Sequence, residues 1–380
     1  MSASKLTRLE QIEMQNLAPY AIKSSESAGR KYPEELDKNR LPFQRDKDRI
    51  IHCKAFRRLE QKTQVFVAGS GDHYRTRLTH TLEVAQISRD LARRLALNED
   101  LCEAIALAHD LGHPPFGHAG EAAIDEVMKA FGLHFEHNQQ SKRIVEVLEK
   151  FYPGFVGLNL TFETLDGLIK HQTAYDQAGK VFEKAAHLEA QVVNVADEIA
   201  YTNHDMDDAL RAGLIDFKHF RKCELWQEAE QMTLEKYGKI RDKYILSSRI
   251  IAAIMSLMTD DFCKNTLANI KKYKIKTTSD VKNFQGSIGC FSDEMKQKTK
   301  VLYSMLFEDF YMSEKVKFGI VKGKRMIKKL FNYYYKNPTK FPKQELLKNK
   351  EGIVIVIKDY IAGMTDPFIT QEYKKAFKVK

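Results

Sequence analysis

Apolar residues recur every three or four positions along most of this chain, and that spacing is typical of helices that bury one face. The stretch 75–97 shows it most clearly, because arginines and acids fill the positions between the apolar ones. Its recurring apolar residues are Leu78, Leu82, Ala85, Leu91 and Leu95. The best candidate for a strand is 64–69, QVFVAG. We therefore expect an all-α fold with at most a short β-hairpin near 64–69.

Capping and turn-forming residues divide this pattern into separate helices. Asn98 is a suitable cap for a helix over 99–112, which begins with acids and ends at a glycine just before two prolines. Residues 112–117 must then form a tight loop. Further helices are expected from near His118, over 137–151 and over 184–213.

The composition excludes several classes of protein. Hydrophobic residues make up 43% of the chain and charged residues 29%, which is a globular and not a disordered composition. No apolar run approaches the roughly 20 residues that a bilayer span needs, and the N-terminus has no apolar signal segment. The five cysteines lie far apart without a C-x-x-C pair, so we expect reduced thiols. These features predict a soluble, cytoplasmic protein with no membrane partner.

The net charge of +10 suggests an anionic partner, and much of it lies at 315–350. This stretch holds twelve Lys or Arg against one acid, Glu345. Its aromatic residues are Phe318, Phe331, Tyr333, Tyr334, Tyr335 and Phe341. Lys and Arg neutralise phosphates and rings offer stacking faces, so 315–350 could bind single-stranded nucleic acid. The alternative, which we favour, is a solvated basic face over helices whose aromatic residues belong to the core.

Most of the histidines lie in the N-terminal part, since eight of the twelve precede residue 138. His109 and Asp110 end an apolar helix, where polar groups are costly to bury unless something binds them. Adjacent helical residues point about 100° apart, so other helices must supply further ligands. The candidates are His80, on 75–97, and Asp197, in an apolar stretch. Two imidazoles and two carboxylates suit a six-coordinate Mn²⁺, Fe²⁺, Ni²⁺ or Mg²⁺ ion better than tetrahedral structural zinc.

In this order the four residues resemble the H…HD…D pattern of the HD-domain metal-dependent phosphohydrolases. The surrounding segments are similar to the deoxyguanosinetriphosphate triphosphohydrolase (dNTPase) branch, from about residue 17 to residue 366. These segments are FQRDKDRIIHCKAFRRLEQKTQVF (43–66), TRLTHTLEVAQ (76–86), AHDLGHPPFGHAGE (108–121), FEHNQQS (135–141), ADEIAYTNHDMDDAL (196–210) and DYIAGMTD (359–366). We expect an N-terminal arm at 1–45, an HD-domain core at 46–213 and a C-terminal helical region at 214–380 packed on the core.

Members of this branch hydrolyse a deoxynucleoside triphosphate to the deoxynucleoside and inorganic triphosphate, by attack at the α-phosphorus. The resemblance implies one divalent metal ion in each active site, bound by His80, His109, Asp110 and Asp197. Such an ion polarises an α-phosphate oxygen and lowers the pKa of a bound water. It also implies dGTP or other dNTPs as substrates, control of dNTP pools, a homo-oligomer, and an activating nucleotide at a second site as a further possibility.

The same resemblance assigns acid and phosphate-binding roles. A 5′-alkoxide leaving group needs a general acid, and His118 with Glu121 matches the family's histidine–acid dyad. Residues three apart on a helix touch, so the carboxylate would orient the imidazole. His113 and His137 match active-site histidines of the family, His113 with a catalytic role and His137 as a phosphate contact. Taken alone, His113 could simply cap a helix end and His137 could simply start the next helix.

Four more positions match substrate-binding residues. Arg77, one turn before the first histidine of the pattern, would clamp the α-phosphate with its planar guanidinium. Gln64 matches a residue that contacts the sugar 3′-hydroxyl. Tyr201 and Asp205 lie four and eight residues after the last aspartate of the pattern, on one helix face. In the family this tyrosine packs beneath the deoxyribose, which excludes a 2′-hydroxyl, and this aspartate binds the 3′-hydroxyl.

One position departs from the family, because Glu198 stands where some relatives carry a lysine that touches phosphate. No P-loop or G-x-G-x-x-G motif is present. Two other functions remain open. One is another HD-type nucleotide phosphohydrolase, such as a 5′-nucleotidase or a signalling-nucleotide hydrolase. The other is a nucleotide- or nucleic-acid-binding regulator with an inactive site.

Overall fold

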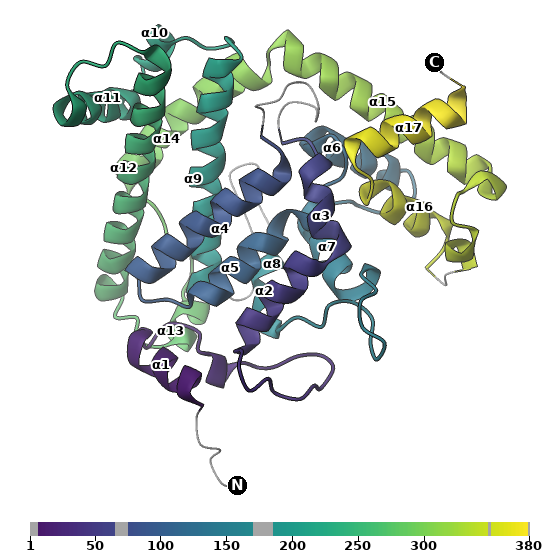
Figure 1. Cartoon of the computed structure of the whole chain (residues 1–380), viewed down its shortest axis with the longest axis horizontal. Helices are drawn as coiled ribbons and strands as arrows, with labels where there is room; N and C mark the ends of the chain where they lie inside the picture. The colour runs from purple at the N-terminus through teal and green to yellow at the C-terminus, as the bar shows by residue number, and fades with distance from the viewer. Residues whose placement is uncertain (1–6, 65–74, 170–184, 349–350, 379–380) are drawn as a thin grey trace. The chain divides into compact units, whose positions relative to one another are not determined.

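A computed structural model of the chain describes residues 7–64, 75–169, 185–348 and 351–378 (Figure 1). Within these residues every regular element of three or more residues is a helix, and extended pairing is confined to isolated bridges such as Thr63 with Thr76. The expected all-α fold is therefore confirmed. Apart from Gln64, the hairpin expected near 64–69 lies outside the described residues. None of the described helices combines the length and the apolar character that crossing a membrane requires.

The structure contains short and long α-helices in succession. They are α1 (Arg8–Asn16), α2 (Pro42–His52), α3 (Lys54–Arg58), α4 (Arg77–Arg94), α5 (Glu99–Ala108), α6 (Gly117–Lys129), α7 (His137–Arg143), α8 (Phe162–Ile169), α9 (Leu188–Arg211), α10 (Phe217–Phe220), α11 (Glu224–Tyr237), α12 (Lys243–Lys272), α13 (Thr278–Asn283), α14 (Asp293–Met305), α15 (Glu314–Lys336), α16 (Ile353–Ala362) and α17 (Asp366–Phe377). The 3₁₀ turns are η1 (Ser24–Glu26), η2 (Leu59–Gln61), η3 (His109–Gly112), η6 (Pro338–Lys340) and η7 (Gln344–Lys348). Two π-helical turns are η4 (Ile144–Leu148) and η5 (Leu306–Tyr311).

Two compact units share the chain, and each is built from three separated segments. The first comprises Met1–Ile50, Thr81–Leu107 and Asn159–Ser313. The second comprises Ile51–His80, Ala108–Leu158 and Glu314–Lys380. The boundaries expected from the sequence, at 45 and 213, stay a prediction.

The first unit is organised around α9, which is buried along most of its length and packs against α12. The His187 side chain caps α9 by accepting a hydrogen bond from the Ala190 N–H. Glu189, fully buried in the first turn, accepts from the Ile22 N–H at 2.8 Å and so holds the N-terminal segment against the core.

The second unit has its own apolar core, formed where α15 packs against α6, α16 and α17. The buried residues of this core are Phe116, Ala123, Ile124, Met128, Phe135, Met326, Ile327, Leu330, Phe331, Tyr334, Phe341, Val356, Ile357, Ile361, Ala362, Met364 and Ile369. Phe116 immediately precedes α6, so the loop before this helix is fixed to the core at one end.

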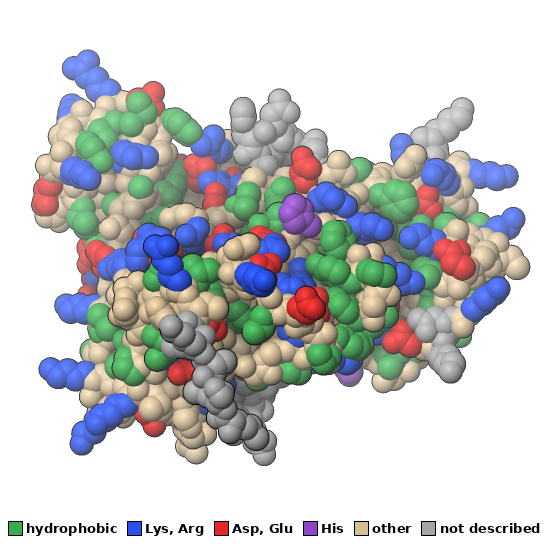
Figure 2. Space-filling view, turned by 60° about the horizontal axis from the view of Figure 1, so that its bottom comes forward, with side chains coloured by type: hydrophobic (Ala, Val, Ile, Leu, Met, Phe, Trp, Pro, Cys, Tyr) green, Lys and Arg blue, Asp and Glu red, His purple; other side chains and the backbone are tan. Residues whose placement is uncertain are grey.

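The basic stretch at 315–350 is mostly helix α15, and three of its aromatic rings are buried. Phe331, Tyr334 and Phe341 lie in the core of the second unit, whereas Phe318 is 75% exposed. On the face drawn in Figure 2, Lys and Arg side chains are spread among acidic and apolar ones. The three buried rings offer no stacking face, whereas Phe318 and Tyr335 are exposed. Binding of single-stranded nucleic acid stays a prediction.

Candidate active site

Three of the predicted metal ligands lie together in the second unit. His80 comes from the first turn of α4, and His109 and Asp110 come from η3. All three are buried, and each offers a ligand atom within 4.8 Å of the other two. His80 Nε2 lies 3.7 Å from Asp110 Oδ2, and His109 Nε2 lies 3.4 Å from Asp110 Oδ1. These distances leave room for one ion bound by two imidazoles and a carboxylate.

At this cluster the α-helix changes to a 3₁₀ turn, because the Ser141 side chain of α7 takes part in hydrogen bonds that would otherwise form within the helix. We expected a helix from 99 to 112, but α5 ends at Ala108 and the last residues form a 3₁₀ turn. The Gly112 N–H donates to Ser141 Oγ at 2.8 Å, and the Ser141 hydroxyl donates to the His109 carbonyl at 2.7 Å. A Cβ on Gly112 would lie 2.1 Å from the His137 carbonyl oxygen, so only glycine permits this approach. The predicted cap is confirmed, since Asn98 Oδ1 accepts from the Leu101 N–H.

Arg77 lies beside the cluster, as predicted from its position in α4. Its Nη1 donates to Asp110 Oδ2 at 2.8 Å, and both side chains are buried. Burial opposes ionisation of Asp110, but His109, Arg77 and His113 hold the pKa of this carboxyl well below its usual range. An ionised carboxylate is the form that binds a metal ion.

Several buried polar atoms around this cluster find no hydrogen-bond partner among the described residues. They are Arg77 Nε, Arg77 Nη2, Gln64 Oε1 and His113 Nε2. Buried polar groups are normally satisfied, so atoms left over in one place indicate a ligand-binding site. Phosphate oxygens and hydroxyl groups have the chemistry to satisfy them.

The second group of predicted residues surrounds Glu121 on α6. His118 Nδ1 lies 3.4 Å from Glu121 Oε2, and His137 Nδ1 lies 3.0 Å from Glu121 Oε1. The carboxylate also accepts from the backbone N–H of His137 at 2.8 Å. His137 does start a helix, α7, yet its ring also packs against His113 with centroids 3.9 Å apart. One acid therefore orients two histidines.

Charge and burial distinguish the members of this group. Although burial raises the pKa of Glu121, His137, His118 and His113 lower it far more and keep the carboxyl ionised. Burial, together with Arg77 and His137, holds the pKa of His113 well below its usual value, so His113 is neutral. The His118 side chain is 58% exposed, whereas His113 and His137 are buried.

The loop before α6 brings these two groups close to each other. Phe116 and Gly117 both adopt left-handed backbone conformations, with φ of 64° and 57°. A Cβ on Gly117 would lie 3.0 Å from Arg77 Nη2, so glycine lets the backbone approach the guanidinium. His113 Nδ1 lies 2.9 Å from Asp110 Oδ1 and connects the loop to the metal-ligand cluster.

The remaining predicted residues, Asp197, Tyr201 and Asp205, belong to α9 in the first unit, and all are buried. Their participation in the site stays a prediction. Within that unit, the Tyr201 ring lies 5.8 Å from the Tyr303 ring, and Asp205 accepts a hydrogen bond from the Tyr311 hydroxyl.

Sequence reasoning did not identify these tyrosines, which follow α9 by about a hundred residues. Tyr303 donates to Glu198 Oε1 at 2.6 Å, and this pairing accounts for the acid at the position that departs from the family. Lys62 and Asp366 were also missed, although both lie inside segments that carry the family resemblance. Periodicity could not single them out, because their partners are distant in the sequence.

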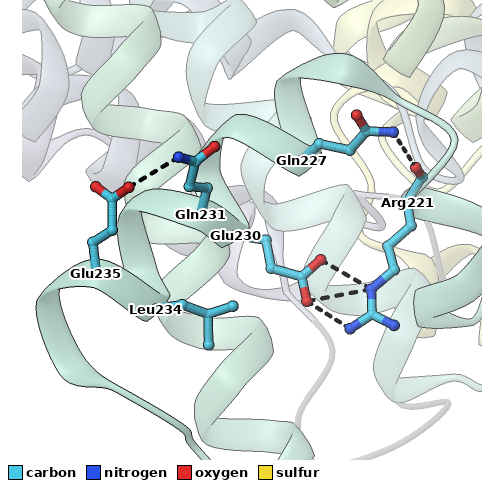
Figure 3. A pocket seen from close by; sticks show the side chains of 6 residues that line it. All are labelled: Arg221, Gln227, Glu230, Gln231, Leu234 and Glu235. Atoms are coloured by element: carbon cyan, nitrogen blue, oxygen red, sulfur yellow. Dashed lines mark hydrogen bonds and ion pairs between the residues drawn. The ribbon is translucent and has the colours of Figure 1, made fainter.

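A surface cavity over α11 in the first unit is not this site (Figure 3). Its only cation, Arg221, is already paired with Glu230 at 2.6 Å. The other lining residues are Gln227, Gln231, Leu234 and Glu235. This lining contains no histidine and no uncompensated positive charge for a phosphate.

Comparison with known families identifies the class. Residues 77–202 match the HD domain, and residues 289–375 match the phosphohydrolase-associated domain. The first match contains the H…HD…D residues His80, His109, Asp110 and Asp197. The protein is an HD-domain phosphohydrolase.

Relatives that match nearly the whole chain show which family of HD-domain phosphohydrolases it belongs to. A deoxyguanosinetriphosphate triphosphohydrolase-like protein from Geobacter sulfurreducens is 46% identical over 97% of both chains. Proteins of the same name from Geobacter metallireducens and Leptospira interrogans are 45% and 42% identical over 96% of this chain. They are covered over 96% and 97% of their own lengths. The chain belongs to the deoxyguanosinetriphosphate triphosphohydrolase-like family, as the sequence motifs indicated.

Proposed function

We propose that this protein is a metal-dependent dNTP triphosphohydrolase that cleaves dGTP or other dNTPs to the deoxynucleoside and inorganic triphosphate, and so controls dNTP pools. The observation that carries the proposal is the buried cluster of His80, His109 and Asp110 with Arg77 hydrogen-bonded to Asp110. A buried metal-ligand set with an adjacent guanidinium suits a phosphorylated substrate. The family relationship supports a nucleotide as that substrate.

The residues present fit one divalent ion. Two imidazoles and an ionised carboxylate supply three ligands, and we propose Asp197 as the fourth. Mixed nitrogen and oxygen ligands suit Mn²⁺, Mg²⁺, Fe²⁺ or Ni²⁺. When bound, such an ion would polarise an α-phosphate oxygen and lower the pKa of a coordinated water.

Arg77 and two histidines would bind the phosphates. Arg77 Nη1 is engaged by Asp110, but Nε and Nη2 are buried without a hydrogen-bond partner among the described residues. These two atoms could donate to paired phosphate oxygens. Because Asp110 Oδ1 accepts the single N–H of the neutral His113 ring at Nδ1, His113 Nε2 is left as an acceptor, and we assign His113 a catalytic role in positioning the substrate, with His137 as a phosphate contact.

His118 is the proposed general acid. Its Nδ1 faces the ionised Glu121, so its Nε2 is the atom that would deliver a proton to the 5′-oxygen as the bond to phosphorus breaks. Glu121 holds the ring in orientation and does not itself transfer the proton. This division of roles follows from the contacts of each group, since Glu121 is shared with His137 while His118 is exposed.

For the sugar, we propose Tyr201 beneath the deoxyribose, with Asp205 and Gln64 at the 3′-hydroxyl. Gln64 supports this role because its buried Oε1 lacks a hydrogen-bond partner among the described residues. The exclusion of ribonucleotides would then be steric.

We further propose a cytoplasmic homo-oligomer with an activating nucleotide at a second site. Light scattering that shows a monomer at every concentration would contradict the oligomer.

The decisive experiment is product analysis with a panel of dNTPs and NTPs, singly and mixed, with Mn²⁺ or Mg²⁺. We expect tripolyphosphate and deoxynucleoside in equal amounts. Orthophosphate or pyrophosphate would instead identify another HD-type phosphohydrolase. An absence of turnover in all mixtures would favour an inactive nucleotide-binding regulator.

The His109→Ala substitution tests the metal assignment. We expect it to abolish both turnover and the rise in melting temperature on adding Mn²⁺, because a ligand that binds the folded state at 100 times its Kd stabilises it by about 2.7 kcal/mol. His134→Ala is the matched control, because His134 is 74% exposed and pairs only with Asp125 among the described residues. Unimpaired hydrolysis in His109→Ala would show that the assignment is wrong.

A further inference from the structure

Asp366, the first residue of α17, is buried and directs its carboxylate away from its own helix. Thr365 caps α17 instead, by accepting a hydrogen bond from the Phe368 N–H. The Asp366 carboxylate accepts from the Thr63 N–H at 3.1 Å, from the Thr63 hydroxyl, and from the Phe116 N–H at 3.0 Å. One carboxylate thus joins α17 to two segments that lie about 300 and 250 residues earlier in the chain.

Lys62 makes a second connection between the same regions. Its side chain is buried, and its Nζ donates to the carbonyls of His113 and Ala362. Ala362 is the last residue of α16, and His113 begins the loop before α6. Burying an amine is costly, so its use here to hold two backbone carbonyls indicates that their positions matter.

The contacts of Lys62 and Asp366 hold backbone segments that carry residues of the candidate site. The Lys62 carbonyl accepts from the Arg77 N–H at 3.2 Å, and Thr63 forms a bridge with Thr76. Phe116 has a left-handed conformation, which costs a residue with a side chain about 1–2 kcal/mol. The hydrogen bond from its N–H to Asp366 helps to offset this cost. The Phe116 ring is held as well, because a Cβ on Gly323 of α15 would lie 2.6 Å from it.

We propose that Asp366 and Lys62 are positioning residues that hold the loop 113–117 and the backbone beside Arg77 in their reactive arrangement. The helices α16 and α17 would therefore take part in catalysis through these two contacts, without touching the substrate. The kinetic part of this inference rests on the proposed function.

A purely structural role makes a different prediction. A carboxylate that only stabilised the core would, when replaced, lower the melting temperature and leave the turnover of the folded protein unchanged. A positioning carboxylate should change kcat, because a displacement of about 1 Å at a reacting group can reduce the rate about 100-fold.

The test compares Asp366→Asn with Asp46→Asn. Asp46 is an equally buried aspartate of the first unit, and it accepts hydrogen bonds from Arg30, Thr161 and Thr164. We expect Asp366→Asn to increase amide hydrogen exchange in the peptide 113–118 and to lower kcat about 10- to 100-fold, with KM changed far less. Asp46→Asn should do neither, even if it melts at a lower temperature.

The pair Thr63→Val and Thr63→Ser keeps the test informative if Asp366→Asn does not fold. Valine preserves the shape but removes the hydroxyl donor to Asp366, whereas serine keeps the donor. We expect loss of kcat with valine and its rescue with serine.

Exchange in 113–118 that does not differ between Asp366→Asn and Asp46→Asn would overturn the proposal, whatever the protein hydrolyses. Increased exchange with an unchanged kcat would also overturn it. Wild-type protein that releases no triphosphate would refute the proposed function instead, and the exchange measurement would still decide whether Asp366 holds the loop.

Discussion

Two carboxylates organise the site residues of the second unit, the buried Asp110 and the half-buried Glu121. Asp110 faces His80, His109 and Arg77, and Glu121 faces His118 and His137. Both stay ionised against the cost of burial, because positive or hydrogen-bonding groups surround them. The Asp110 carboxylate is suited to binding a metal ion, and the Glu121 carboxylate is suited to orienting the His118 ring. The two carboxylates differ in role because different residues surround them.

If His118 is the general acid, replacing it should lower kcat without changing the binding of substrate or metal. We expect His118→Gln to lower kcat by about 100- to 10,000-fold, the usual contribution of a general acid, with little change in KM or in Mn²⁺ affinity. Steady-state kinetics and metal titration measure these quantities. His134→Gln, at an exposed histidine that also pairs with a carboxylate, should keep wild-type kcat. A similar kcat in both variants would exclude His118 as the acid.

Lys62 predicts a pH dependence of stability. Burial, together with Arg58 and Arg77, lowers the pKa of Lys62 from 10.5 to about 7. Above pH 7 the folded protein releases a proton that the unfolded chain retains up to about pH 10.5, so this group makes the free energy of unfolding rise with pH, by at most about 1.4 kcal/mol per unit.

The Lys62→Met variant lacks this titration. Its melting temperature should therefore fall increasingly below that of the wild type as the pH rises from 7.5 to about 9.5, by about 2–4 °C for each kcal/mol. Scanning calorimetry across this range provides the measurement. A difference that does not change with pH would show that Lys62 is protonated throughout.

Local spacing predicted some of these residue contacts and could not predict others. His118 and Glu121 are three residues apart on one helix, and that spacing alone foretold their contact. The sharing of Glu121 with His137 depends on how α7 packs, and no periodicity reports this. Lys62 and Asp366 show the same limit, since their partners lie up to 303 residues away.

At the scale of elements, the end of α5 shows how a neighbouring helix changes local structure. The sequence of 99–112 favours one continuous helix, and the structure has a helix followed by a 3₁₀ turn. The cause is the Ser141 hydroxyl, which bonds both the Gly112 N–H and the His109 carbonyl. The sequence predicted the helix and its Asn98 cap, but it could not predict that Ser141 of α7 would contact the end of this helix.

This arrangement predicts the effect of Ser141→Ala. The substitution leaves the Gly112 N–H without its partner in a buried place, and it should cost about 1–3 kcal/mol in stability. Because η3 carries His109 and Asp110, we also expect weaker Mn²⁺ binding in isothermal titration. The control is Ser304→Ala, since among the described residues Ser304 hydrogen-bonds only within its own helix, to the Lys300 carbonyl. Equal Mn²⁺ affinity in the two variants would mean that the turn holds its shape without Ser141.

At the scale of the whole molecule, each compact unit is assembled from segments that are far apart in the sequence. The second unit combines Ile51–His80 and Ala108–Leu158 with Glu314–Lys380, so its apolar core requires distant parts of the chain. The sequence suggested that aromatic residues of 315–350 belong to a core, and Phe331, Tyr334 and Phe341 are buried in that of the second unit. The sequence could not show which faces meet, and the expectation of a divided arm, core and C-terminal region reads the chain only in sequence order.

Removal of residues 314–380 should therefore affect far more than the segment itself. It would expose the apolar side of α6, including Ala123, Ile124 and Met128. We expect the shortened chain to bind a hydrophobic dye and to lose part of its cooperative unfolding transition. A cooperative transition and no dye binding would show that the second unit is stable without α15, α16 and α17.

The bond between Asp366 and the Phe116 N–H also has a consequence for synthesis. These residues are 250 positions apart, so at about 5–20 residues per second a ribosome adds Asp366 roughly 10–50 s after Phe116. Throughout that interval the nascent chain already carries His80, His109 and Asp110 but not the aspartate that holds the loop. Nucleotide hydrolysis should therefore begin late, after α17 has left the ribosome, and a chain that stalls before it should leave the cell's nucleotides intact.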